Sequence, residues 1–126
     1  MDSDGDAVAW ANASGRVTML PATARAIAAN EMKKGDVLGA ARFAGAQAAK
    51  DAASYLPLSD PELVSGVTID FTVVDDAVEV IARVGGATPI GARMHALSAV
   101  TVATLTIYDM CKSADRTMTI GPVALD

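Results

Sequence analysis

Two short runs of alternating apolar and polar residues constrain the fold of this chain more than any other feature. In residues 67–73 and again in 78–84, apolar side chains occupy every second position, and Asp75 and Asp76 separate the two runs. An alternation with a period of two is typical of a β-strand that buries one face. The two runs therefore predict a β-hairpin with one apolar face, which another layer of the protein must cover.

Two long segments rich in alanine can form that layer. Residues 37–55 follow Asp36, whose carboxylate can cap a helix, and residues 92–114 place apolar side chains at helical spacing. The remaining elements are a strand at 15–20, a helix at 22–29, a loop at 85–91 and a strand at 117–125 broken at Gly121-Pro122. This order predicts an α+β ferredoxin-like sandwich, a four-stranded antiparallel sheet with both long helices on one face.

One domain accounts for these elements, since 126 residues is the usual size of a single domain. Residues 1–14 are rich in Asp, Ala and Ser and are predicted to form a flexible N-terminal arm, so the domain itself covers residues 15–126. The alternation places Ile81 on the face of the sheet that the helices leave open. Burying that face requires another subunit, so we expect a homo-oligomer.

Charge and cysteine content exclude several classes of function. The net charge is −5 and the sequence has no basic run, which argues against binding to nucleic acid or to an anionic membrane. The longest uncharged run, residues 94–108, is shorter than the roughly 18 residues of a membrane span. Cys111 and His95 are the only soft metal ligands, so we predict no metal site and a reducing, cytoplasmic location.

Four stretches of the chain carry unusual motifs. They are KGDVLGAARFAGAQAAK at 34–50, LPL and a following proline at 56–61, LTIYDMCK at 105–112, and IGPV at 120–123. Together with the order of elements over about residues 15–126, these motifs resemble the MoaC family, the cyclic pyranopterin monophosphate synthases of molybdenum-cofactor biosynthesis. The resemblance implies a ferredoxin-like fold, in agreement with the fold predicted above.

The resemblance also implies a reaction. Members of the family act on a cyclised GTP derivative that a radical-SAM partner enzyme supplies, rebuild its purine into a pterin and release pyrophosphate. The resemblance implies no cofactor, because acid–base groups move the protons while cations hold the phosphates. It further implies a pocket at a dimer interface, with three dimers assembled into a hexamer.

Three candidate catalytic residues follow from the resemblance, namely Lys50, Asp109 and Lys112. Asp109 and Lys112 are i, i+3 neighbours on one helix face, so the carboxylate can orient the ammonium group. Spacing alone would favour a solvated ion pair at a helix end, and Lys50 alone would be an ordinary surface lysine. Lys34 is a candidate for phosphate binding, with a solvated turn as the alternative.

The chain departs from the family pattern at four positions around the expected pocket. Ser59 and Asp60 replace a Cys-His pair, and Arg93 and His95 replace two glutamates on either side of Met94. Asp60 could pair with His95 or Arg93 and give a rearranged acid–base site, with Ser59, Arg93 and Met94 contributing to substrate binding. The alternative is that Asp60 begins an Asp-Pro turn and that His95 lies on a solvated helix face.

Two functions are therefore open at this stage. One is a MoaC-like lyase or cyclase that acts on the cyclised GTP intermediate, or on a related cyclised nucleotide, by lysine-based acid–base chemistry. The other is a non-catalytic paralogue of the family with a structural or regulatory role. The retained Lys50, Asp109 and Lys112 favour the enzyme, whereas the changes at Asp60 and His95 favour either the paralogue or a different substrate.

Overall fold

The computed structural model describes residues 8–126. Its elements are β1 (Ala9–Thr18), α1 (Pro21–Ala28), α2 (Val37–Lys50), the 3-10 turn η1 (Ala52–Ser54), β2 (Val64–Val74), β3 (Ala77–Gly86), α3 (Pro89–Cys111), β4 (Thr119–Ile120) and β5 (Ala124–Leu125). The order of strands and helices is the predicted one. One difference lies in α2, which ends at Lys50 and gives way to η1 before the expected end at residue 55.

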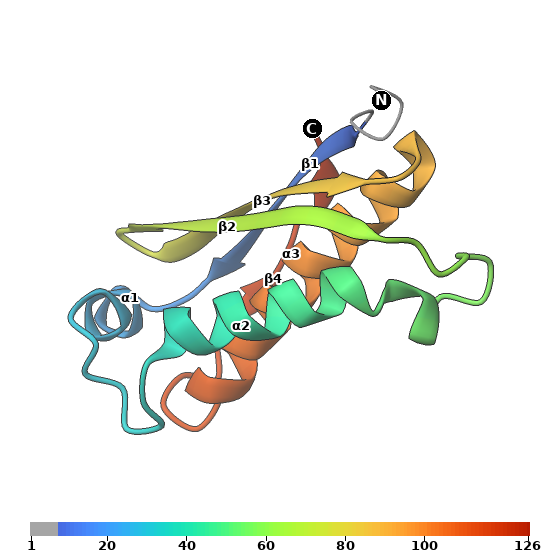
Figure 1. The fold of residues 1–126 in the computed structure, drawn as a ribbon. Coiled ribbons are helices and arrows are strands. Elements are labelled where there is room, and N and C mark those ends of the chain that lie inside the picture. The colour runs from blue at the N-terminus through green and yellow to red at the C-terminus, as the bar shows by residue number, and fades with distance from the viewer. Residues whose placement is uncertain (1–7) are drawn as a thin grey trace.

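The strands form one antiparallel sheet in the order β2-β3-β1-β4, and β5 also pairs with β1. Helices α2 and α3 lie side by side on one face of this sheet and run in opposite directions (Figure 1). The arrangement confirms the predicted α+β ferredoxin-like sandwich. The C-terminal strand is interrupted at Gly121-Pro122, as predicted, so its two halves pair separately with β1.

The predicted hairpin forms one side of the sheet, with β2 as the edge strand. Val73 pairs with Val78 and Ile69 with Ala82, so residues of the two alternating runs share one face. On that face Val80 is fully buried, whereas Ile81 on the opposite face is 50% exposed. The alternation in the sequence therefore identified the core face and the open face correctly.

Strand β1 corrects the predicted N-terminal arm. Residues 9–14, expected to be loose, pair continuously with β3, from Ala9 opposite Gly86 to Thr18 opposite Ala77. The Trp10 ring lies close over glycines of β2 and β3, where side chains larger than hydrogen would crowd it. This pairing is long-range and leaves no local signal in an Ala- and Ser-rich segment. Residues 1–7 of the expected arm lie outside the described residues.

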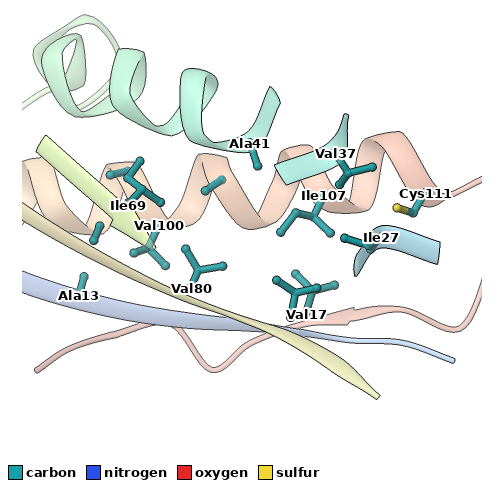
Figure 2. Close-up of a cluster of buried hydrophobic side chains, with 14 of the residues drawn as sticks. Ala13, Val17, Ile27, Val37, Ala41, Ile69, Val80, Val100, Ile107 and Cys111 are labelled. Atoms are coloured by element: carbon teal, nitrogen blue, oxygen red, sulfur yellow. The ribbon is translucent and has the colours of Figure 1, made fainter. Parts of the chain in front are cut away.

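The core is aliphatic, as the composition indicates, and lies between the helices and the sheet (Figure 2). Val17, Val80, Val100 and Ile107 are fully buried there. Gly45 of α2 allows close approach, because a Cβ at this position would lie 2.8 Å from the Ala99 carbonyl oxygen of α3. Substitution of Gly45 would therefore push the two long helices apart.

Side-chain caps fix the beginnings of the two long helices. The Asp36 carboxylate accepts a hydrogen bond from the Gly39 amide at 3.0 Å, which confirms the predicted cap. The Thr88 hydroxyl accepts from the Gly91 amide at 3.0 Å, and α3 begins at Pro89. The loop expected at residues 85–91 is therefore shorter, since its first residues extend β3 and its last ones begin α3.

Helix α3 is long and apolar enough to cross a membrane by the criteria of length and hydropathy. Half of its apolar window is buried inside the protein, where it packs against α2 and against strands β1 and β3. A core helix of a globular domain has the same composition, so the position of α3 beneath the sheet accounts for its hydropathy.

Candidate active site

Most of the candidate residues gather in two clusters at the ends of α3, which Lys50 and Arg93 do not join. Met94 and His95 lie in its second turn, and Asp109 lies about 21 Å further along its axis at roughly 1.5 Å per residue. The cluster at the far end contains Lys34, Asp109 and Lys112, and is called the lysine cluster below. The cavity at the near end is called the α3 N-terminal cavity.

In the lysine cluster the Lys112 ammonium group donates a hydrogen bond to the Asp109 carboxylate and a second, at 3.2 Å, to the Asp109 carbonyl oxygen. The hydrogen bond and the positive charge of Lys112 lower the pKa of Asp109, and the charge of Lys34 lowers it further. Lys34 therefore lies near enough for its charge to act on Asp109. Both side chains of the pair are more than half exposed, so a substrate can reach them.

Two shallow hollows flank the lysine cluster. One, of about 430 Å³, includes Lys33 and Lys34 in its wall, and the other, of about 460 Å³, includes Lys112 and Arg116. Cations that line open hollows can hold phosphate groups. The sequence analysis missed Arg116, because only the turn after α3 brings it back beside Lys112.

Asp115 anchors the end of α3 beside the lysine cluster. Its carboxylate is buried and accepts hydrogen bonds from the Leu20 amide at 2.9 Å, from the Thr23 hydroxyl at 2.8 Å, and from the amide and hydroxyl of Thr117 at 2.8 and 2.7 Å. Burial by itself would raise the pKa of Asp115, but these hydrogen bonds outweigh it and lower the pKa to about 2. The anchor joins the turn after α3 to the beginning of α1.

The α3 N-terminal cavity has a volume of about 250 Å³. It brings together four residues predicted to form the site, Ser59, Asp60, Met94 and His95. The rest of its wall is formed by Leu58, Glu62, Ile90 and Gly91. The fifth predicted residue of this region, Arg93, is exposed and does not line the cavity.

His95 is buried in the wall of this cavity. It is only 3% exposed, so the alternative of a histidine on a solvated helix face does not hold. The cause is the pitch of α3, which turns this position toward the glycine end of β3, where a Cβ at Gly86 would lie 3.4 Å from His95 Cδ2. Neither ring nitrogen has a hydrogen-bond partner within residues 8–126. In the same part of the chain, no ion pair or hydrogen bond joins Asp60 to His95 or Arg93.

Glu62 is a wall residue that the sequence analysis did not single out. The Thr88 hydroxyl donates to both oxygens of its carboxylate, at 3.1 and 3.0 Å, while accepting from the first turn of α3. Glu62 thus connects the loop after Pro61 to the beginning of α3. Its carboxylate is engaged, whereas Asp60 is exposed and available to a ligand.

Lys50 lies apart from both clusters. It is exposed on the outward face of α2, in a shallow hollow that it shares with Phe43 and Gln47. The two helices run in opposite directions (Figure 1) and contact each other where Gly45 meets Ala99. Lys50 and Asp109 lie on opposite sides of this contact, so about 20 Å separates them along the helix axes. One protomer therefore does not bring the three predicted catalytic residues together.

Metal ligands and reactive thiols do not add to this site. Among the described residues, no three His, Cys, Asp or Glu side chains are grouped closely enough to share a metal ion. Cys111 is fully buried, and burial raises the pKa of its thiol to about 11, with a smaller contribution from the negative charge of Asp115. A buried neutral thiol is a poor nucleophile, so Cys111 is a core residue.

Fold and site together define a ferredoxin-like α+β protein with an exposed Lys–Asp pair at one end of its core helix and a partly acidic cavity at the other. The profile of the MoaC family matches residues 3–126. The chain belongs to the MoaC family.

Individual relatives agree with this assignment. A cyclic pyranopterin monophosphate synthase of Desulforamulus reducens is 47% identical over 118 residues, which span 91% of this chain and 71% of that protein. Another of the same name, from Parvibaculum lavamentivorans, is 48% identical over 117 residues, which span 91% of this chain and 73% of that protein. A molybdenum cofactor biosynthesis bifunctional protein of Chlorobaculum tepidum is 46% identical over 114 residues, and the chain spans only 36% of its length.

Proposed function

We propose that this protein is a MoaC-like lyase of molybdenum-cofactor biosynthesis. In this proposal it converts a cyclised GTP intermediate, or a related cyclised nucleotide supplied by a radical-SAM enzyme, and releases pyrophosphate. Membership of the family and the names of the relatives support the pathway. A cytoplasmic location belongs to the same proposal.

The observation that carries the proposal is the Asp109–Lys112 pair with Lys34 beside it. The carboxylate of Asp109 holds the ammonium group of Lys112 in one orientation, so Lys112 Nζ can deliver a proton to a fixed position. The nearby Lys34 and Arg116 can hold the phosphates whose departure completes the reaction. Exposure of this pair to solvent leaves it accessible to a substrate.

The separation of the clusters supports a site made by two copies of the chain. A small nucleotide cannot touch Lys50 and Lys112 of one protomer at once, because they lie at the C-terminal ends of two helices that run in opposite directions. A two-fold dimer can bring the lysine cluster of one protomer to Lys50 of its partner. We propose such a dimer as the unit of a hexamer.

A direct assay tests the proposed function. Purified protein is incubated with the cyclised GTP intermediate, and pyrophosphate and a pterin are measured. We expect turnover by the wild type and a fall in turnover of about 100-fold or more for Lys112→Gln. Arg25→Gln, which changes an exposed cation on α1 outside both clusters, should leave turnover unchanged.

The non-catalytic paralogue makes the opposite prediction. The altered Ser59 and Asp60 favour this candidate, because they change two walls of the cavity. A paralogue would turn over neither the cyclised GTP intermediate nor related cyclised nucleotides, and would instead form stable mixed oligomers with an active relative. Turnover of a different cyclised nucleotide would keep the enzyme class and reject only the parent substrate.

A further inference from the structure

Asp115 is a buried charged residue to which the proposed reaction gives no role. Its side chain is 2% exposed, and it lies in the turn between Lys112 and Arg116. It lines neither of the hollows beside the lysine cluster, so a ligand held in them would meet its neighbours instead. Burial of an ionised carboxylate costs free energy unless hydrogen bonds replace its water. What those hydrogen bonds hold in place therefore decides what Asp115 does.

The two oxygens of the Asp115 carboxylate bind different parts of the chain. Oδ1 accepts hydrogen bonds from the Thr117 amide at 2.8 Å and from the Thr117 hydroxyl at 2.7 Å. Oδ2 accepts from the Leu20 amide at 2.9 Å and from the Thr23 hydroxyl at 2.8 Å, at the beginning of α1. The first pair of hydrogen bonds closes the turn after α3, and the second pair fixes that turn to the body of the domain.

The end of α3 lacks the usual helix stop. A glycine or asparagine in the left-handed conformation commonly ends a helix, but no residue between 112 and 117 has a positive φ. Instead, the amides of Ala114 and Asp115 both donate to the Cys111 carbonyl oxygen at 3.0 Å. The Asp115 carboxylate then holds the residues that follow. The path of the chain after α3 therefore depends on this one side chain.

Arg116 depends on this turn more than Lys112 does. The ammonium group of Lys112 is already held by Asp109, which lies one turn before it in α3. Arg116 lies beyond the helix, and no ion pair holds its guanidinium group within residues 8–126. It nevertheless lines the same hollow as Lys112. Its place there is set by the backbone of the turn, which Asp115 fixes.

We propose that Asp115 is a positioning residue that places Arg116 beside Lys112 for the binding of a pyrophosphate group. Two cations held side by side can share the charges of pyrophosphate, and a planar guanidinium group can donate two hydrogen bonds to one phosphate. The inference rests on the proposed function, in which the lysine cluster holds the phosphates that leave. It adds the group that keeps one of the two cations in place.

Pyrophosphate is the probe, because its binding to the intact protein at pH 7 can be measured by calorimetry without turnover. Asp115→Asn should weaken this binding about tenfold, since the amide places a donor against groups that already donate. Val80→Ala is the matched control, because it removes buried packing on β3 and destabilises the core. It should leave the affinity for pyrophosphate unchanged. Equal losses of affinity in the two variants would mean that Asp115 acts only through overall stability, which overturns the proposal.

A double-mutant cycle separates positioning from a general effect. Asp115→Asn should weaken pyrophosphate binding about tenfold in the Arg25→Gln background. In the Arg116→Gln background it should weaken binding less than about twofold, because the cation that Asp115 places is then absent. An undiminished loss in that background would contradict the proposal.

Thr117→Val is a milder variant, which removes one donor and keeps the carboxylate of Asp115. It should weaken pyrophosphate binding by about two- to threefold, because the turn loses one of the hydrogen bonds that close it. An affinity equal to that of the wild type would count against the positioning role even if Asp115→Asn did not fold.

Binding and turnover together distinguish this inference from the proposed function. Pyrophosphate binding that depends on Asp115, without turnover of the cyclised GTP intermediate, would reject the proposed function alone. Turnover by the wild type, with pyrophosphate bound equally well by the wild type and Asp115→Asn, would reject the positioning role alone. A wild type that binds no pyrophosphate would overturn the positioning role as well.

Discussion

His95 and Asp115 are both buried polar side chains near the ends of α3, but they differ in their hydrogen bonding. Asp115 is 2% exposed and accepts four hydrogen bonds from α1 and from the turn after α3. His95 is 3% exposed and has no partner among residues 8–126. A buried polar group with all its partners stabilises a fold, whereas one without them costs free energy in the folded state. The buried polar group at the C-terminal end of α3 thus has its hydrogen bonds within the protomer. The one at the N-terminal end has none among residues 8–126.

The largest expected effect is on turnover, and it tests whether one active site takes residues from two protomers. Lys50→Gln and Lys112→Gln should each reduce turnover by about 100-fold or more. If one site takes Lys50 from one protomer and Lys112 from its partner, refolding the two variants together in equal amounts should restore about a quarter of wild-type activity. A mixed oligomer that forms but stays inactive would contradict a shared site.

Asp115→Asn should cause the next largest effect, on stability. The amide places a donor against groups that already donate, so we expect the free energy of unfolding to fall by about 2 kcal/mol, measured by urea denaturation. The folded pKa of about 2 lies below the ordinary value of 3.8, so the stabilisation by Asp115 is complete above about pH 4. It should disappear as the pH falls through 2, and the variant should lack this part of the acid dependence. An unchanged acid profile would contradict the role of Asp115 as an anchor.

His95→Leu should stabilise the protein, whereas Asp115→Asn should destabilise it. Removing a buried group without partners, with an apolar side chain in its place, should raise the free energy of unfolding by about 1 kcal/mol. A clear loss of stability instead would show that His95 has a partner in the free protein, such as a tightly held water molecule.

The smallest expected effect on stability is that of Asp109→Asn. The side chains of Asp109 and its partner Lys112 are both more than half exposed, so solvent screens their interaction. The urea midpoint of the variant should therefore equal that of the wild type within experimental error. Turnover should nevertheless fall, because Lys112 loses the group that orients it. A large loss of stability would mean that the pair supports the fold rather than the reaction.

The sequence predicted the parts of the site that are local. Asp109 and Lys112 share a helix face by spacing. The meeting of Ser59 and Asp60 with Met94 and His95 in one cavity is long-range, and only the family resemblance indicated it. Burial of His95 could not be predicted, because it depends on the face of α3 that packs toward the glycine end of β3. Glu62 was missed for the same reason, since its partner Thr88 is distant in sequence. Arg116 was missed because it lies beyond the end of α3, where the following turn decides its position beside Lys112.

By itself the sequence determined the family, the order of elements and the core face of the hairpin, because motifs and residue alternation are local properties. The extension of β1 to Ala9, the separation of Lys50 from Lys112, and the contrast between His95 and Asp115 were decided only by the tertiary structure. These features depend on which residues meet across long distances in sequence. Local spacing carries no information about such contacts, whereas packing and hydrogen bonding fix them.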